Sequence, residues 1–240
     1  MPEIAIIGYG RFGQLATMHL KKKAKLFVAD KKLISKTPQG VRTLSIEEAA
    51  GKKHVVLAVP INQIVNSVKL IAPYLQPGST VYDVCSVKEQ PIKWMCRYLP
   101  SSVSIIGTHP LFGPDSAGAS LKNRMIAVSP VRTSPTGMKC LKNFLESLHL
   151  DIVVMGAEEH DRLMASTLFL TQFVFRGIKH LPLKKHQFTT QNYKILMQLV
   201  DAANNDSVEM FRDMYKYNRF ARPIPPKLIK SFQKLTDSIK

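Results

Sequence analysis

Short runs of apolar residues alternate with helical patterns over the first two thirds of the chain. Seven of these runs have the length of a β-strand and lie at residues 3–7, 25–29, 54–60, 79–84, 103–107, 125–128 and 151–155. Nearly continuous apolar runs of this length are typical of strands that are buried on both faces of a parallel sheet. Between them, apolar residues recur at helical spacing, as in residues 14–23, 62–74 and 135–148. This alternation predicts an α/β fold with a mainly parallel sheet of roughly seven strands.

The last third of the chain shows helical patterns only. They cover residues 157–180, 190–204, 206–220 and 226–240. We therefore predict two domains, a larger one at 1–156 that holds the sheet and a smaller, all-helical one at 157–240. The first helix of the second domain carries more apolar side chains than an isolated helix needs. A subunit interface would bury them.

A glycine-rich turn follows the first apolar run. It reads Gly8-Tyr9-Gly10-Arg11-Phe12-Gly13 and is followed by a helical pattern. Glycines at the point where a strand turns into a helix let the backbone approach a pyrophosphate, and the free N–H groups of the helix N-terminus suit its negative charge. The turn predicts a Rossmann-type dinucleotide site made by these six residues. The alternative is a nucleotide-free domain that uses the glycines only for close packing.

An acidic residue ends the second apolar run. Asp30 lies seventeen residues beyond Gly13, where a carboxylate can accept both hydroxyls of a ribose. This position favours NAD over NADP. Three cations, Arg11, Lys31 and Lys32, could instead pair with a 2′-phosphate, so NADP stays open as an alternative.

Residues that could bind a ligand or take part in catalysis follow several of the expected strands. In parallel sheets, ligands gather at the carboxyl ends of the strands. Gly8, Asp30, Pro60 (with Val59 before it), Ser86 and His109 all fall at such ends. We expect these residues to line one crevice.

The charge of the chain is unusual. The sequence carries 34 lysines and arginines against 17 acidic residues, a net charge of +17. The lysines are scattered, at residues 21–23, 52–53, 184–185 and 227–240, and are not interleaved with aromatic residues as in a nucleic-acid-binding module. We therefore expect steering of an anionic cofactor and substrate, and not specific nucleic-acid binding.

Composition indicates an ordinary globular protein. Of 240 residues, 45% are hydrophobic, and no apolar stretch is long enough to span a bilayer. The N-terminal sequence lacks the basic-then-apolar pattern of a secretory signal. The three cysteines, Cys85, Cys96 and Cys140, have no metal-like spacing. We expect a cytoplasmic protein without a metal site, whose cysteines are reduced packing residues.

Three motifs together resemble the prephenate and arogenate dehydrogenases of tyrosine biosynthesis. They are Ser86-Val87-Lys88, Thr108-His109-Pro110-Leu111-Phe112-Gly113-Pro114-Asp115 and Glu158-Glu159-His160-Asp161-Arg162-Leu163. The C-terminal pattern, with Asn192-Tyr193, Asn204-Asn205-Asp206-Ser207 and Tyr217-Asn218, is similar to that of plant-type arogenate dehydrogenases. The resemblance implies oxidative decarboxylation of a small anionic cyclohexadienol with hydride transfer to a nicotinamide. It also implies a homodimer that pairs through the C-terminal helices.

The resemblance assigns roles in the larger domain. His109 matches the catalytic histidine, which accepts the hydroxyl proton as the hydride leaves. Ser86 matches a serine that hydrogen-bonds the same hydroxyl or the histidine. Lys88 either orients the loop or favours the anionic substrate, and Gly113 falls in the substrate-binding stretch after His109.

The resemblance also assigns residues in the helical domain to the substrate. Asp206 matches a position where an acidic residue goes with arogenate, whose ammonium a carboxylate attracts, and a neutral one with prephenate. The alternative is that Asp206 caps the helix that starts at Ser207. Gln172 stands where the family often has a second pocket histidine. Ala202 stands where some members have a carboxylate-binding arginine, so another cation must serve, for which the candidates are Arg176, Lys194 and Arg212.

Other functions stay open at this point. The close alternative is prephenate dehydrogenase, which gives 4-hydroxyphenylpyruvate. A second is a nicotinamide-dependent reductase of the β-hydroxyacid dehydrogenase type, which the motif around His109 argues against. A third is a non-catalytic relative that binds a nucleotide or a nucleic acid. It is allowed by the high charge and by the changes at Gln172, at Ala202 and at Leu168, which stands one turn before Gln172 where polar residues are common in the family.

Overall fold

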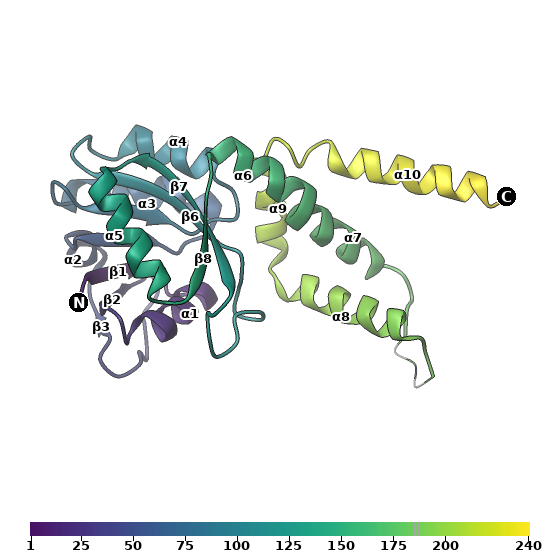
Figure 1. Ribbon diagram of the computed structural model, residues 1–240, viewed down its shortest axis with the longest axis horizontal. Coiled ribbons are helices and arrows are strands. Elements are labelled where there is room, and N and C mark those ends of the chain that lie inside the picture. The colour runs from purple at the N-terminus through teal and green to yellow at the C-terminus, as the bar shows by residue number, and fades with distance from the viewer. Residues whose placement is uncertain (185, 187) are drawn as a thin grey trace. The chain divides into compact units, whose positions relative to one another are not determined.

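The computed structural model describes residues 1–184, 186 and 188–240 (Figure 1). The chain divides into two compact units, residues 1–160 and 161–240. The domain limits 1–156 and 157–240 stay a prediction. Lys185, one of the scattered lysines, lies outside the described residues.

The first unit holds an eight-stranded sheet in the order β3-β2-β1-β4-β5-β6-β7-β8. The strands are β1 (Glu3–Ile7), β2 (Lys25–Ala29), β3 (Arg42–Thr43), β4 (His54–Leu57), β5 (Thr80–Asp83), β6 (Ser104–Pro110), β7 (Arg124–Arg132) and β8 (Leu150–Val154). All neighbours are parallel except β6 and β7, which run antiparallel. The α/β fold with a mainly parallel sheet is confirmed.

The sequence pattern did not predict one strand, β3. β3 pairs two residues, Arg42 and Thr43, with Phe27 and Val28 at the edge of the sheet. Both of its residues are exposed, so no apolar run marks it. The expected count of seven strands was therefore one too low.

Helices cover both faces of the sheet (Figure 1). They are α1 (Arg11–Leu20), α2 (Ile46–Ala50), α3 (Ile64–Ile71), α4 (Glu89–Tyr98) and α5 (Pro135–Glu146), with short 3₁₀ turns η1 (Ile61–Gln63) and η2 (Ala72–Tyr74) around α3. Leu15 of α1 and Leu145 of α5 share a core with Tyr82 and Ile126, so α1 and α5 pack on one face. α4 packs on the other, where a Cβ added to Gly107 would lie 2.8 Å from Ile92 Cδ1.

The second unit is helical. α6 (Ala157–Met164) crosses the point of division, and η3 (Ala165–Phe169), α7 (Leu170–Ile178), α8 (Gln191–Asn205), α9 (Val208–Tyr217) and α10 (Ile224–Ser238) follow. Phe169 is the centre of the core of this unit, because its ring stacks on those of Phe173, Phe211 and Tyr215. The smaller helical part is thereby confirmed.

The helix expected at 157–180 is interrupted in the middle. η3 is a π-helix, which widens the turn between α6 and α7. Hydroxyls in and beside it donate to backbone carbonyls, Thr167 to Leu163 and Thr171 to Thr167, both at 2.7 Å. Such bonds loosen the regular ladder of a helix. Apolar periodicity alone does not reveal this interruption.

Other expectations concern cysteines, membranes and metals. Cys85 is buried, but Cys96 and Cys140 are exposed, so the expectation that all three are packing residues was wrong for two of them. Among the described residues, no helix combines the length and apolarity needed to cross a bilayer. In the same part of the chain, no cluster of three metal-ligating side chains occurs. The cytoplasmic location stays a prediction.

Candidate active site

The glycine turn lies between β1 and α1, at the carboxyl edge of the sheet. Gly8 has a φ of +103°, and a Cβ there would lie 2.4 Å from the carbonyl oxygen of Ala58, so only glycine fits. Gly10 is the N-cap of α1, and a Cβ added to it would meet nothing within 4 Å. The space over the helix N-terminus is therefore open, and the first N–H groups of α1 have no acceptor within the helix. This geometry fits a pyrophosphate.

A cleft of about 540 Å³ opens beside this turn. Of the residues expected to hold the cofactor, it is lined by Gly8, Tyr9, Gly10, Asp30, Lys31, Val59 and Pro60. Residues from the ends of β1, β2 and β4 thus converge on one cleft. Its volume is in the range of small-molecule and cofactor sites. The residues present therefore fit a dinucleotide.

Asp30 is fixed in place within this cleft. Its Oδ2 accepts a hydrogen bond from the Tyr9 N–H at 2.6 Å, and its Oδ1 accepts one from the Lys32 N–H at 2.8 Å. Each carboxylate oxygen has a further lone pair, which can accept a hydrogen bond from a hydroxyl. The carboxylate is therefore pre-oriented at the position where a ribose is expected.

Four other residues expected to hold the cofactor do not line the cleft: Arg11, Phe12, Gly13 and Ser86. The side chain of Phe12 packs on the core between the sheet and α1, and Gly13 is buried, where a Cβ would lie 2.1 Å from the carbonyl oxygen of Gly8. Arg11 forms an exposed ion pair with Asp115 at 2.7 Å. α1 starts three residues earlier than expected, at Arg11, and this turns the Phe12 side chain toward the sheet. The Phe12 side chain packs on the core, so its backbone N–H is the group left to serve a cofactor, and the assignment of Phe12 to the cofactor site stays a prediction.

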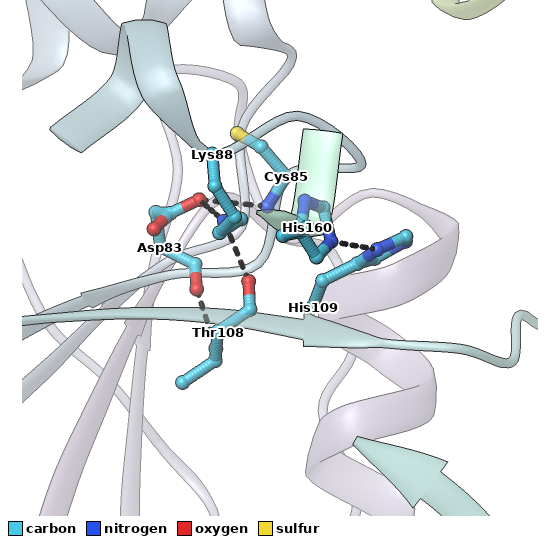
Figure 2. Close-up of polar contacts among 6 residues, drawn as sticks. All are labelled: Asp83, Cys85, Lys88, Thr108, His109 and His160. Carbon is cyan, nitrogen blue, oxygen red and sulfur yellow. Dashed lines mark hydrogen bonds and ion pairs between the residues drawn. The ribbon is translucent and has the colours of Figure 1, made fainter. Parts of the chain in front are cut away.

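His109 lies near the carboxyl end of β6, paired in register with Ala127 of β7. It is 7% exposed, and its Nδ1 lies 2.9 Å from Nε2 of His160, which is buried at the start of α6 (Figure 2). The two rings meet edge to face, with centroids 5.1 Å apart. Among the described residues, no group hydrogen-bonds to the other ring nitrogen of His109, Nε2. Because His160 holds Nδ1, Nε2 can act on a substrate.

The surroundings of His109 favour its neutral form. Burial in the protein holds the pKa of His109 well below its ordinary value, and the neighbouring His160 and the positive charge of Lys88 lower it further. A histidine with a lowered pKa is neutral at neutral pH and can accept a proton. This is the protonation state that a general base needs.

Lys88 belongs to a buried cluster with Asp83 and Thr108, the residue before His109 (Figure 2). Its ammonium pairs with the carboxylate of Asp83 at the end of β5 and donates to the carbonyl oxygen of Thr108 at 2.7 Å. The Thr108 hydroxyl in turn donates to the carbonyl oxygen of Asp83. Lys88 and Asp83 have no exposed side-chain surface. The cluster thus ties the Ser86 loop to the strand that carries His109, which favours the loop-orienting role of Lys88 over contact with a substrate.

Ser86 and Gly113 flank this region. Ser86 follows β5 by three residues and is half-buried, on the same edge of the sheet as His109. Gly113 is half-buried in the loop after β6, where its N–H donates to the Ser116 hydroxyl at 3.0 Å. Their roles in catalysis and substrate binding stay predictions.

In the second unit, Gln172 and Asp206 are brought together. The buried Gln172 donates from Nε2 to Oδ2 of Asp206 at 2.7 Å. Arg176 completes the cluster, since it donates to Oε1 of Gln172 at 2.9 Å and to the carbonyl oxygen of Asp206 at 2.7 Å. Partial burial lowers the pKa of Arg176, and the Asp206 carboxylate opposes this. An anionic and a cationic group thus lie side by side.

The position of Asp206 argues against the alternative that it caps the helix after it. Asp206 is the C-cap of α8, and the N-cap of α9 is Ser207, whose hydroxyl accepts the Met210 N–H at 3.0 Å. The helix therefore does not rely on Asp206 for its cap. Of the three candidate cations, only Arg176 contacts the carboxamide and the carbonyl of this cluster, whereas Lys194 and Arg212 are exposed.

Two residues of the site were not assigned from sequence. His160 stood in a motif without a role of its own, and Asp83 was only one residue of the strand expected at 79–84. A histidine between two acidic residues, Glu159 and Asp161, near the start of an expected helix was the available signal for His160. An aspartate that ends an apolar strand five residues before a lysine was the signal for Asp83.

Comparison with known proteins decides the family. The family profile described as "Prephenate dehydrogenase, nucleotide-binding domain" matches residues 29–154. The chain belongs to the prephenate dehydrogenase family. A second profile, "TYRAAT1-like, C-terminal domain", matches residues 178–240. The resemblance of the chain to the prephenate and arogenate dehydrogenases is confirmed by the match over residues 29–154.

Relatives in the prephenate dehydrogenase family include archaeal and plant proteins. The chain is 25% identical to a probable arogenate/prephenate dehydrogenase of Methanocaldococcus jannaschii, over 99% of this chain and 56% of that protein. It is also 25% identical to arogenate dehydrogenase 2, chloroplastic, of Arabidopsis thaliana, over 90% of this chain and 64% of that protein. The chain thus spans a little more than half the length of these two relatives.

Solved structures of prephenate dehydrogenase family members share the fold. The Aquifex aeolicus prephenate dehydrogenase in complex with hydroxyphenyl propionate and NAD+ matches with a TM-score of 0.76 and 19% identity, over 100% of this chain and 91% of that chain. Synechocystis arogenate dehydrogenase matches with a TM-score of 0.68 and 21% identity, over 99% of this chain and 91% of that chain.

Proposed function

We propose that the chain catalyses the oxidative decarboxylation of arogenate to tyrosine, with hydride transfer to a nicotinamide cofactor. The observation that supports this most is His109, a buried histidine with a lowered pKa whose Nδ1 is held by His160 and whose Nε2 faces no described partner. It lies on the same edge of the sheet as the dinucleotide cleft. A bound nicotinamide supplies the hydride acceptor.

In the proposed reaction, His109 Nε2 takes the proton of the substrate hydroxyl as hydride leaves the carbinol carbon. The ring carboxylate then leaves as carbon dioxide, and the electron pair of the broken carbon–carbon bond makes the ring aromatic as a phenolate, which takes up a proton. Protonated His109 donates from Nδ1 to His160 Nε2, so the pair remains hydrogen-bonded throughout. Ser86 is proposed to hydrogen-bond the reacting hydroxyl or His109.

The recognition of arogenate is proposed to involve Asp206 and Arg176. The Asp206 carboxylate suits the ammonium group that distinguishes arogenate from prephenate. The Arg176 guanidinium, which contacts Gln172 and the Asp206 carbonyl, is the cation of this cluster and suits a carboxylate. The two charges side by side match a zwitterionic amino acid.

Replacing Asp206 by asparagine is expected to lower kcat/KM with arogenate by about ten-fold or more, on the scale of about 1.4 kcal/mol. The amide keeps the shape and can still accept the Gln172 hydrogen bond, but it lacks the charge. The efficiency with prephenate should stay constant or rise. Asp201→Asn, at an exposed carboxylate of α8, is the matched control. An unchanged ratio of the two efficiencies would remove the reason for preferring arogenate.

The proposed cofactor is NAD, with NADP as the alternative. The fixed Asp30 carboxylate would accept ribose hydroxyls and repel a 2′-phosphate. NADP stays the alternative because Lys31 and Lys32 line the same cleft and could pair with a 2′-phosphate. The overall test measures reduction of NAD and of NADP, each with arogenate and with prephenate. Activity with prephenate alone would support the alternative, prephenate dehydrogenase, and activity in none of the four combinations would refute the proposed function.

A homodimer through the C-terminal helices is also proposed. α10 has no buried residue, and Ile229, Phe232 and Leu235 form an exposed apolar row at a spacing of three residues. A second copy of the chain would bury this row.

Phe232→Glu is therefore expected to convert a dimer into a monomer, because the charge would have to be buried in the interface. Light scattering after size exclusion measures the mass. Lys230→Glu, at an exposed position of the same helix, should leave the dimer intact. A wild-type chain that is monomeric at all concentrations would refute this interface.

A further inference from the structure

The first unit contains a second, larger cavity that is separate from the dinucleotide cleft. It has a volume of about 710 Å³ and lies between the sheet and the pair α1 and α5. No residue that lines it also lines the dinucleotide cleft. A volume of this size is in the range of sites that hold small molecules.

The walls of the cavity are mainly apolar. Leu15 and Leu20 of α1, Leu141 and Phe144 of α5, and Val56 and Ile126 of the sheet line it. Apolar walls of this kind suit an aliphatic or aromatic body.

A small number of polar groups face this apolar space. Nδ1 of His54 and the hydroxyl of Tyr82 form a hydrogen bond of 3.1 Å, and burial lowers the pKa of His54 and raises that of Tyr82 to about 12. Nε2 of His19 is buried and has no hydrogen-bond partner in the part of the chain that the structure describes. A buried polar atom without a hydrogen bond destabilises the fold, so Nε2 of His19 is available to hydrogen-bond a ligand in the cavity.

Lysines gather at the end of the cavity that lies toward the start of β4. Lys53 lines the cavity there, with its ammonium donating to the Gly78 carbonyl at 2.6 Å. Lys21–Lys23 directly follow Leu20, which also lines the cavity, and all three are exposed. These side chains carry part of the +17 charge, and they favour a negative group at this mouth.

We propose that this cavity binds an amphipathic carboxylate. Its apolar body lies between the sheet and the two helices, and its carboxylate lies at the lysine-rich mouth, within reach of His54 and Lys53. The proposal does not depend on the proposed dehydrogenase activity, because none of its residues belongs to the dinucleotide cleft or to the His109–His160 pair.

The chain offers its own reporter for this site. Cys140 is an exposed thiol that lines the cavity, whereas Cys96 is an exposed thiol on α4 that does not. The full chain would be treated with a maleimide with and without dodecanoate, below the micelle concentration, and the labelled cysteines quantified by mass spectrometry. We expect the labelling rate of Cys140 to fall by about ten-fold, the protection given when about nine tenths of the sites are occupied, and that of Cys96 to stay constant.

Two controls test the cavity and the charge. Dodecyltrimethylammonium has the same tail with a cationic head, and it should not protect Cys140. Leu141→Trp fills the cavity and should abolish the protection by dodecanoate, whereas Lys142→Trp, an exposed position on the same helix, should preserve it. Should Leu141→Trp fail to fold, Ala16→Phe on α1 fills the same space.

Three outcomes would overturn the proposal. Unchanged labelling of Cys140 would show that dodecanoate does not enter. Equal protection of Cys96 and Cys140 would indicate general coating of the surface. Equal protection by both head groups would remove the role of the lysines and of the carboxylate.

Discussion

Replacing His109 by alanine is expected to lower kcat by between about a hundred-fold and ten thousand-fold, the range of a lost general base. Alanine has no imidazole nitrogen that can take the hydroxyl proton. His109 does not line the dinucleotide cleft, so the affinity for the cofactor should be retained. Steady-state reduction of the nicotinamide gives kcat, and fluorescence titration gives the cofactor affinity. His180→Ala, an exposed histidine outside the site, is the control.

The His109 prediction has a clear failure. An alanine variant with undiminished kcat would exclude His109 as the base and would revive the reductase hypothesis. Loss of both activity and cofactor affinity would instead indicate misfolding of the first unit. A circular dichroism spectrum identical to that of the wild type separates these cases.

His160 is a positioning residue in this scheme. His160→Asn removes the partner of Nδ1, so a smaller decrease in kcat than that of His109→Ala is expected, because the base remains but is less well oriented. The pH profile adds a readout that a purely structural role would not change. His160 helps to lower the pKa of His109, so its removal should move the acid limb of kcat/KM to higher pH.

The layered fold was predictable because nearly every strand is an apolar run between turn signals. The exceptions have physical reasons. β3 consists of two exposed residues held by the edge of the sheet, and the π-helix at Ala165–Phe169 depends on hydroxyl-to-carbonyl hydrogen bonds and not on apolar spacing. Neither leaves a periodic signal.

The convergence of the candidate cofactor residues on one cleft was predictable for a similar reason. Parallel strands bring their carboxyl ends to one edge, so Gly8, Asp30 and Pro60 had to converge. Side-chain directions were not predictable to the same degree. The start of α1 at Arg11 turned Phe12 into the core, and contacts such as that of His109 with His160, 51 residues later, depend on tertiary packing that spacing does not encode.

The Lys88–Asp83 pair is the other feature for which a large effect is expected. Lys88→Met should lower the free energy of unfolding by about 3–5 kcal/mol, the cost of leaving one charge of a buried pair without its partner. The Asp83 carboxylate would retain at Oδ2 the Cys85 N–H at 3.0 Å, while its Oδ1 is buried with no partner in the described structure. Urea unfolding measures the change. The double variant Asp83→Asn/Lys88→Met should recover much of the loss, because no buried charge is then unpaired.

The same variant separates the two roles that the sequence left open for Lys88. A general base works in its neutral form, so kcat/KM falls as the pH falls through the pKa of His109. Lys88 lowers the pKa of His109, so kcat/KM of the wild type is expected to fall only below about pH 6.5, the ordinary pKa of histidine. Lys88→Met should move this decrease in kcat/KM to higher pH. Lys93→Met, at an exposed lysine of α4, should change neither stability nor profile. If Lys88 instead binds the anionic substrate, the variant will raise KM for the substrate while stability stays constant, and the buried cluster will not be what positions His109.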